Sequence, residues 1–299
     1  MNIPVIMMFD DSYVIPASVA IYSLLKNAVR QHFYDLRIMY TNISEKHKNK
    51  LIEMLDGFSN ASIKFFNMKE YNTKLDIPDT ISGWPREIIY KLIIADIFTD
   101  IDRAIVTDVD VVFVGDVSQE FIKFKTDEYI AMVKNSTLPH DKPFSLDITD
   151  NNIHFMYGAG YMIYNTKAMR RDKMPKKYID FMHKNLQYLR FPDQEILNIV
   201  NYPNIKPLHP RNMALVSWWR LKDFVFNKYD YNSSEKEHLE SLEKPIQIHY
   251  VTWTTWAKPW KDINAPLANL WYRYLTYTNF FTEFFITKNK KHQKRFLWW

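Results

Sequence analysis

Short apolar runs alternate with amphipathic stretches over the first 115 residues, a pattern typical of strands alternating with helices. The apolar runs predict strands over 3–9, 34–40, 61–67 and 103–114. The amphipathic stretches predict helices over 16–29, 44–56 and 85–98. Pro16 and Pro85 suit a first helical turn, and Ser44 suits an N-cap. This order predicts βαβ units and therefore an α/β fold with a mainly parallel sheet flanked by helices.

The second half of the chain continues with a less regular pattern. Further strands are expected over 128–134 and 159–165, and further helices near 175–189 and 193–201. The polar segment 229–245 predicts a surface loop or a short helix. Beyond residue 263 we expect an aromatic-rich helix followed by a basic tail.

Composition excludes several kinds of site. The chain of 299 residues is 47% hydrophobic and 24% charged, which is typical of a globular protein. It has no cysteine, which excludes disulfides, thiolate metal sites and a cysteine nucleophile. It has 5 glycines where average usage would give roughly 20, and neither a G-x-G-x-x-G nor a Walker motif occurs.

The net charge of +5 comes from the end of the chain. Residues 286–299 carry five Lys or Arg residues and no acid, and the remaining 34 basic residues equal the 34 acidic ones. The body is therefore neutral, which argues against a nucleic-acid partner. Residues 1–9 lack the basic start of a signal peptide, and no apolar run is long enough to span a membrane. The sequence thus predicts a cytoplasmic protein.

Two carboxylates interrupt the most strand-like run of the chain. Asp108 and Asp110 are two residues apart, so in a strand they would share one face. Two desolvated like charges are costly unless a cation lies between them, and oxygen ligands suit Mg²⁺ or Mn²⁺. The alternative is a strand end where both carboxylates meet water or cap a helix.

Several short motifs accompany this D-x-D in a fixed order. They are Asp10-Asp11-Ser12-Tyr13, Tyr90-Lys91-Leu92, Asp108-Val109-Asp110 followed by Gly115-Asp116, Gly158-Ala159-Gly160 with Asn165, the segment from Asp193 to Asn198, and His249-Tyr250 with Lys258-Pro259-Trp260. Together, from residue 3 to 262, they resemble glycosyltransferase family 8, the retaining GT-A enzymes, and above all its bacterial lipopolysaccharide and lipooligosaccharide galactosyl- and glucosyltransferases. The resemblance implies a GT-A catalytic domain over 1–262 and a C-terminal extension over 263–299.

The resemblance also implies a metal-dependent reaction. Asp108, Asp110 and His249 would hold Mn²⁺ or Mg²⁺, and the metal would bridge the two phosphates of UDP-galactose or UDP-glucose. Without the other motifs, His249 in the strand-like IQIHY is more typical of a packed core residue.

The resemblance further implies which residues contact the donor. These are Asp10, Tyr13, Lys91, Asp108, Val109, Gly158, Ala159, Gly160 and Lys258. Tyr13 would stack on the uracil, Asp10 would accept a hydrogen bond from the base, and Lys258 would contact the diphosphate. Local sequence offers plainer roles: a helix start at Asp10, a solvated helix face at Lys91 with Arg86 as a substitute, and a surface loop at Lys258.

The chain departs from the family pattern in two places. Gly158 stands where the family usually has Asn or Asp, and Asn135 is a candidate for the place of a donor-contacting Asp. The stretch from His249 to Lys258 is longer than usual and lacks a glycine, so this loop is expected to follow a different path.

Asp193 and Gln194 are the implied catalytic residues, facing the transferred sugar. Double displacement with retention needs a carboxylate nucleophile, and an amide such as Gln194 is a poor one. We therefore expect front-face attack, with the leaving phosphate helping to deprotonate the acceptor and Asp193 holding sugar hydroxyls. The plainer interpretation is a helix start at Asp193. Two rival functions are an inverting GT-A transferase and an inactive glycan-binding relative.

The C-terminal tail mixes aromatic and basic residues. Such a mixture suits an anionic membrane surface, and a disordered solubilising tail is the alternative. With a lipid-linked saccharide as acceptor, the protein is expected to lie peripherally on the inner face of the cytoplasmic membrane.

Overall fold

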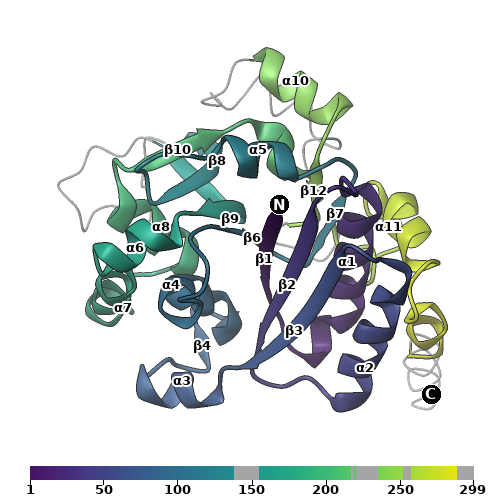
Figure 1. The fold of residues 1–299 in the computed structure, drawn as a ribbon, viewed down its shortest axis with the longest axis horizontal. Coiled ribbons are helices and arrows are strands. Elements are labelled where there is room, and N and C mark those ends of the chain that lie inside the picture. The colour runs from purple at the N-terminus through teal and green to yellow at the C-terminus, as the bar shows by residue number, and fades with distance from the viewer. Residues whose placement is uncertain (138–154, 217–218, 220–234, 252–256, 288–299) are drawn as a thin grey trace, which may run out of the picture.

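The computed structural model describes residues 1–137, 155–216, 219, 235–251 and 257–287. Within these ranges the chain forms a central sheet covered by helices on both faces, as Figure 1 shows. The α/β fold expected from the sequence is therefore confirmed.

The central sheet has seven strands in the order β10-β8-β9-β6-β1-β2-β3. Their bounds are β1 Asn2–Met8, β2 Phe33–Tyr40, β3 Ala61–Asn67, β6 Ala104–Thr107, β8 Ile130–Thr137, β9 Phe155–Tyr164 and β10 Ile205–Leu208. β9 runs antiparallel to both of its neighbours, and all other adjacent pairs are parallel. A parallel sheet places the ends of β1 and β6 at the same edge, where ligands commonly bind.

Alternate residues of β1 enter opposite halves of the core. Val5 and Met7 pack in the cluster that includes α1, whereas Ile6 and Met8 pack in the cluster that includes η3 and α4. Because both faces are covered, the strand reads as a continuous apolar run rather than an alternating one.

Most helices cover one or the other face of this sheet. Their bounds are η1 Asp11–Tyr13, α1 Val14–Asn27, α2 Glu45–Met54, η2 Leu55–Gly57, α3 Lys69–Lys74, η3 Arg86–Ile93, α4 Ile94–Ile97, α5 Ser118–Lys123, α6 Thr166–Arg171, α7 Met174–Asn185, α8 Pro192–Asn201, η5 Pro210–Met213, α10 Glu235–Glu243 and α11 Ala268–Leu275. Pro16 lies in the first turn of α1, and Ser44 caps α2 by accepting from the amide of His47.

The prediction of a single strand over 103–114 is wrong, because the chain leaves the strand conformation at the D-x-D and two separate strands form. β6 ends at Thr107, and β7 (Val111–Phe113) belongs to a second sheet of order β11-β12-β7, with β11 Ala214–Leu215 and β12 Gln247–His249. All three residues of β7 are buried, so the apolar run continues through a change of sheet.

One helical expectation needs correction as well. The segment expected as a helix over 85–98 is mainly the 3-10 helix η3, with a short α4, and it follows the two-stranded pair β4 (Thr80–Ile81) and β5 (Trp84–Pro85). The sequence pattern also missed α6. Of the two alternatives for 229–245, a surface loop or a short helix, the structure has a short helix, α10, and the basic residues of the tail lie outside the described residues.

The C-terminal segment packs on the rest of the described chain through aromatic residues. Trp271 of α11 is fully buried and contacts Trp260 and Phe284, with ring centroids 5.7 and 5.6 Å apart. Asn27 at the end of α1 donates to the Tyr274 hydroxyl over 2.9 Å. In the part of the chain that the structure describes, no helix is long and apolar enough to cross a membrane.

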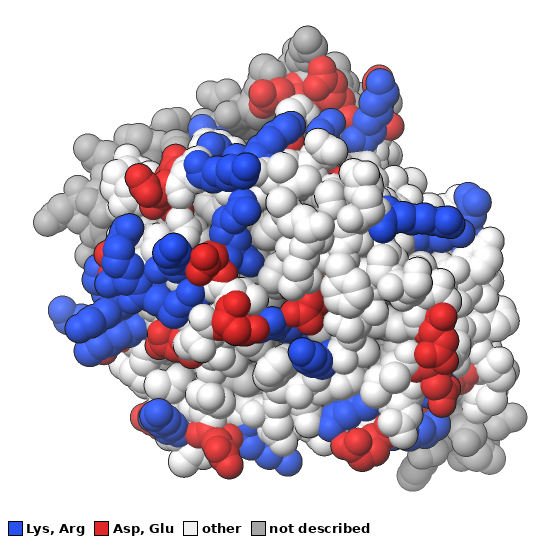
Figure 2. Space-filling view, viewed as in Figure 1, with Lys and Arg blue, Asp and Glu red and all other residues white. Residues whose placement is uncertain are grey.

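Charged side chains of both signs are interspersed on the face shown in Figure 2, with uncharged surface between them.

Candidate active site

The D-x-D, His249 and the first motif converge near the carboxyl ends of β1 and β6. Asp10 follows β1, Asp108 follows β6, and the two strands are neighbours in the sheet. His249 ends β12, which pairs with β7 directly after the D-x-D. This is the edge at which ligands of open α/β sheets bind.

Asp108, Asp110 and His249 form a compact group of possible metal ligands. Their ligand atoms all lie within 4.8 Å of one another. His249 Nε2 is 2.9 Å from an Asp110 oxygen and 3.6 Å from an Asp108 oxygen. Ligands on opposite sides of a small divalent cation are about 4.2 Å apart, and two carboxylates with one imidazole suit such an ion. The residues therefore fit the metal that the sequence pattern implies.

Backbone hydrogen bonds fix the two carboxylates in place. The Asp108 amide donates to the Gly160 carbonyl over 3.1 Å, and the Tyr250 amide donates to the Asp110 carbonyl over 2.9 Å. Val109 between them is buried in the core. The two acids therefore reach one site because the chain turns around a buried valine, not because they share one face of a strand.

Lys91 is buried beneath this group. Its ammonium lies 2.7 Å from Asp108, 2.6 Å from Asp193 and 3.1 Å from the Ala159 carbonyl. Burial alone would lower the pKa of Lys91, but the two carboxylates raise it, so the side chain is charged. Its solvated-face alternative is therefore wrong, and Arg86 pairs with Asp79 instead.

Lys258 forms an ion pair with Asp110, and its ammonium also lies 5.4 Å from the centre of the Trp260 ring. Its side chain is only 12% exposed, so it is not a plain surface-loop residue. Burial would raise the pKa of Asp110, but Lys258 and His249 outweigh that effect and lower it. Asp110 is thus held as a carboxylate, the form that binds a metal.

Asp193 and Gln194 lie in the first turn of α8, and neither caps it. Asp193 turns to Lys91, and the N-cap Phe191 has no side-chain bond to the helix. Gln194 Oε1 accepts from the Ala159 amide over 3.4 Å. The helix start expected at Asp193 is therefore present, although Asp193 lies in the first turn and does not cap it.

Strand β9 passes close behind the metal group. A Cβ atom at Gly160 would lie 2.3 Å from His249 Cε1 and 2.4 Å from Nδ1, separations that real atoms do not adopt. The absence of a side chain at residue 160 therefore makes room for the imidazole. Ala159 is buried, and Gly158 pairs with Val133 of β8.

The turn after β1 carries Asp10 and Tyr13. Asp10 accepts from the Ser12 amide over 2.9 Å, so its helix-start role is present. Tyr13 lies edge-on to Trp260, with ring centroids 6.0 Å apart, and burial raises the pKa of its hydroxyl. The charges of Lys258 and Asp110 act on that hydroxyl, which places Tyr13 beside the metal group.

Sequence reasoning gave no role to two amide side chains that hold the site together. Asn198 of α8 accepts from the Tyr157 amide over 2.8 Å and donates to its carbonyl over 2.9 Å, which ties the helix to β9. Gln247 of β12 donates to Thr107 of β6 over 2.7 Å. Asn198 lay within a noted motif, whereas Gln247 gave no signal. The Asn135 side chain and residues 252–256 lie outside what the structure describes.

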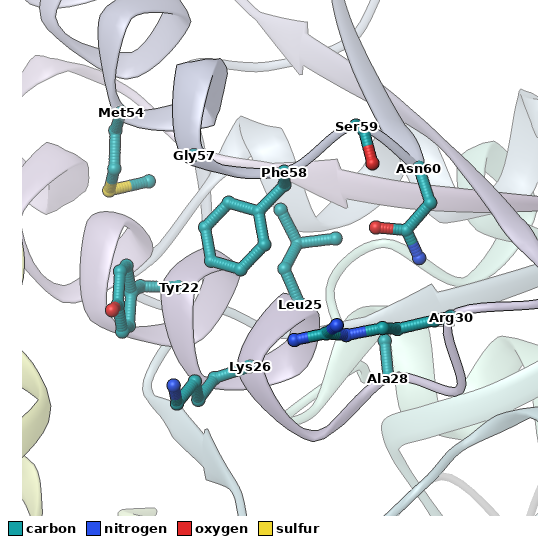
Figure 3. Close-up of a pocket in the computed structure, with 10 residues that line it drawn as sticks. All are labelled: Tyr22, Leu25, Lys26, Ala28, Arg30, Met54, Gly57, Phe58, Ser59 and Asn60. Carbon is teal, nitrogen blue, oxygen red and sulfur yellow. The ribbon is translucent and has the colours of Figure 1, made fainter.

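A separate open pocket of about 400 Å³ lies at the other end of α1 (Figure 3). Lys26, Arg30 and Phe58 are among its lining residues. A helix of 14 residues spans about 20 Å, so α1 separates this pocket from the turn that carries Tyr13. None of the motif residues lines it.

The chain is similar in sequence to known proteins. A family model described as "Glycosyl transferase family 8" matches residues 4–264. General stress protein A of Bacillus subtilis is 26% identical over 149 residues, which cover 48% of each chain. A putative glycosyltransferase of Haemophilus influenzae is 22% identical over 265 residues, covering 87% of this chain and 75% of that protein.

Solved structures share the fold. The bifunctional glycosyltransferase WbbM is similar with a TM-score of 0.80 and 20% identity, over 95% of this chain and 51% of that one. The galactosyltransferase LgtC, in complex with donor and acceptor sugar analogs, has a TM-score of 0.75 and 17% identity, over 93% and 96%. The chain thus spans about half the length of WbbM and of the Bacillus protein.

We expect Gly160→Ala to weaken metal binding. The added methyl would push the His249 ring away from the two carboxylates, and changes of this kind around a ligand typically cost about 10–100-fold in metal affinity. Isothermal titration with Mn²⁺ measures the change. Gly57→Ala is the control, because its Cβ meets nothing within 4 Å. Equal Mn²⁺ affinity in the two variants would show that His249 is not a ligand.

Proposed function

Because this chain belongs to glycosyltransferase family 8, we propose that it transfers galactose or glucose from a UDP-sugar to a saccharide hydroxyl with retention of anomeric configuration. The observation that carries the donor assignment is the Asp108–Asp110–His249 group at the carboxyl edge of the sheet. When bound there, Mn²⁺ or Mg²⁺ supplies positive charge for the leaving diphosphate.

Each residue around the metal group has a different role in donor binding. Lys258 stabilises the charge that develops on the diphosphate, Tyr13 stacks on the uracil, and Asp10 accepts from the base. Lys91 acts from below, holding Asp108 and Asp193 in place through its two ion pairs. Val109 and the Gly158-Ala159-Gly160 segment bring backbone close to the donor.

The environment of α8 supports front-face attack rather than double displacement. A double displacement needs a free carboxylate at the sugar. Asp193 is engaged with the Lys91 ammonium, and Gln194 offers only an amide. With no suitable nucleophile among these two, the leaving phosphate takes the acceptor proton as the acceptor attacks, and Asp193 orients sugar hydroxyls.

A lipid-linked saccharide of lipopolysaccharide or a related glycan is the acceptor we propose. The LgtC structure contains an acceptor sugar analog, and the helical segment 281–287 exposes Phe281, Phe285 and Ile286. Exposed aromatic and aliphatic side chains of this kind suit a membrane surface. We therefore propose peripheral attachment through the extension 263–299, beside a catalytic domain over 1–262.

Two other functions share the fold. An inverting GT-A transferase would need a general base beside the acceptor hydroxyl, and an inactive glycan-binding relative would not need a metal. The presence of all three ligands, each held in place, favours the active retaining enzyme over the binding protein.

We expect UDP and UDP-sugars to stabilise the protein only when Mn²⁺ is present. A ligand at 100 times its dissociation constant adds about 2.7 kcal/mol to the free energy of unfolding, which a thermal-shift assay detects. Asp110→Ala should abolish the shift, whereas Asp180→Ala, at an exposed surface ion pair, should keep it. No shift with any UDP compound would exclude a metal-bridged UDP site.

The anomer of the product distinguishes retention from inversion. With α-linked UDP-galactose or UDP-glucose and a simple sugar acceptor, we expect an α-linked product, because the acceptor attacks the face that the phosphate leaves. Proton NMR of the product reads this linkage directly. A β-linked product would establish the inverting alternative.

Attachment to anionic vesicles should depend on the exposed aromatic side chains of 281–287. We expect Phe281→Ser with Phe285→Ser to weaken vesicle binding about tenfold or more, because two phenyl groups no longer leave water. Vesicle sedimentation provides the measurement. Tyr188→Ser, at an exposed aromatic residue elsewhere, is the control, and equal losses in both proteins would contradict a specific anchor.

A further inference from the structure

Outside the metal group, one imidazole lies between two carboxylates from distant parts of the chain. His47 Nδ1 is 2.7 Å from an Asp11 oxygen, and Nε2 is 2.9 Å from a Glu283 oxygen. The His47 side chain is only 14% exposed. Its ring also packs beside Phe280, with centroids 5.8 Å apart.

Each ring nitrogen of His47 lies within hydrogen-bond distance of a different carboxylate. A hydrogen bond with an ionised partner is roughly twice as strong as one between neutral groups. His47 therefore joins Asp11 and Glu283 through two charge-assisted hydrogen bonds, the stronger kind. Each bond connects segments that are separated in the sequence, by 36 and 236 positions.

The remaining charges around the imidazole complete the network. Lys46 and Lys50 of α2 lie 3.3 and 2.7 Å from Glu283 oxygens. Burial would raise the pKa of Glu283, but the bonds from His47, Lys50 and Lys46 lower it to about 2. Likewise, burial would raise the pKa of Asp11, but bonds from Ser44 and His47 outweigh it and lower the pKa. Both carboxylates are therefore ionised at neutral pH.

At the other end of the network, Asp11 fixes the turn between β1 and α1. Its carboxylate accepts from the Ser44 amide over 2.9 Å, and its own amide donates to the Asn42 carbonyl over 2.8 Å. The same turn contains Asp10 and Tyr13, and the Tyr13 amide bonds the Asp10 carbonyl over 3.1 Å. A displacement of Asp11 would therefore move the two side chains assigned above to the donor base.

We propose that His47 is a positioning residue that couples the C-terminal helical segment 281–287 to the donor-binding turn 10–13. In its doubly bonded form it holds the turn in the conformation that receives the nucleotide. The identity of that ligand rests on the proposed function, whereas the coupling itself depends only on the two hydrogen bonds.

Amide hydrogen exchange tests the coupling without any ligand. The variants are His47→Gln and Glu283→Ala. The controls are His183→Gln, at a histidine whose Nε2 bonds the Leu75 carbonyl, and Glu53→Ala, at an exposed glutamate of α2. We expect exchange in a peptide covering 10–14 to rise about tenfold in both variants, the effect of losing one charged hydrogen bond, and in neither control. Faster exchange confined to 281–287 in Glu283→Ala would overturn the coupling.

Titration with UDP and Mn²⁺ then tests the consequence for the donor. We expect each variant to bind UDP about fivefold more weakly, and the double variant no more weakly than the worse single one, because either change breaks the same link. Unchanged UDP affinity together with faster exchange at 10–14 would overturn the positioning role. If the wild type itself fails to bind UDP, the proposed donor is wrong, and the exchange measurement still decides whether the link exists.

Discussion

Repulsion among three neighbouring carboxylates is the constraint around which this structure is arranged. Asp108 and Asp193 both contact the Lys91 ammonium, and Asp110 contacts Lys258 and His249. Like charges at such short range in a dry environment are costly unless cations lie between them. Lys91 meets this need from η3, and in doing so it joins a helical segment, the D-x-D and the start of α8. Removal of one partner would leave a buried charge without compensation, which is more damaging than the loss of an ordinary contact.

The local pattern of apolar and polar residues was sufficient to predict most of the fold, but it did not predict the end of β6 at the D-x-D. The strand over 34–40 was predictable because a buried strand has a recognisable apolar run, and the strand over 61–67 because its residues alternate in polarity. The run over 103–114 was predicted as one strand because β6 and β7 are both buried, and an apolar pattern does not show which sheet a strand joins. The 3-10 geometry of η3 and the antiparallel direction of β9 are also set by partners elsewhere in the chain. The metal group itself was predictable from residue types and motif order, whereas the buried position of Lys91 was not, since Lys in an amphipathic helix normally faces solvent.

The residues beyond 263 contribute directly to the packing around the site. Trp260 contacts Tyr13 on one side and Trp271 on the other, so a chain of aromatic rings extends from the turn 10–13 to α11. Phe284 continues it, one residue after Glu283, which bonds His47. The C-terminal segment is therefore joined to the turn 10–13 both by apolar ring contacts and by polar hydrogen bonds. None of these contacts has a local sequence signature, because each joins residues far apart in the chain.

The geometry of the metal group is set by the pairing and packing of the strands rather than by the conformations of flexible side chains. Asp108 is fixed by the Gly160 carbonyl, Asp110 by the Tyr250 amide, and Gln247 binds Thr107 beside them. The His249 ring occupies the space that a side chain at residue 160 would fill. Each ligand is thus set by a neighbour on a different strand, and the donor set is formed once the strands have paired. For the function proposed above, such preorganisation means that a bound cation would not have to order its own ligands, so more of its interaction energy would be left for the leaving diphosphate.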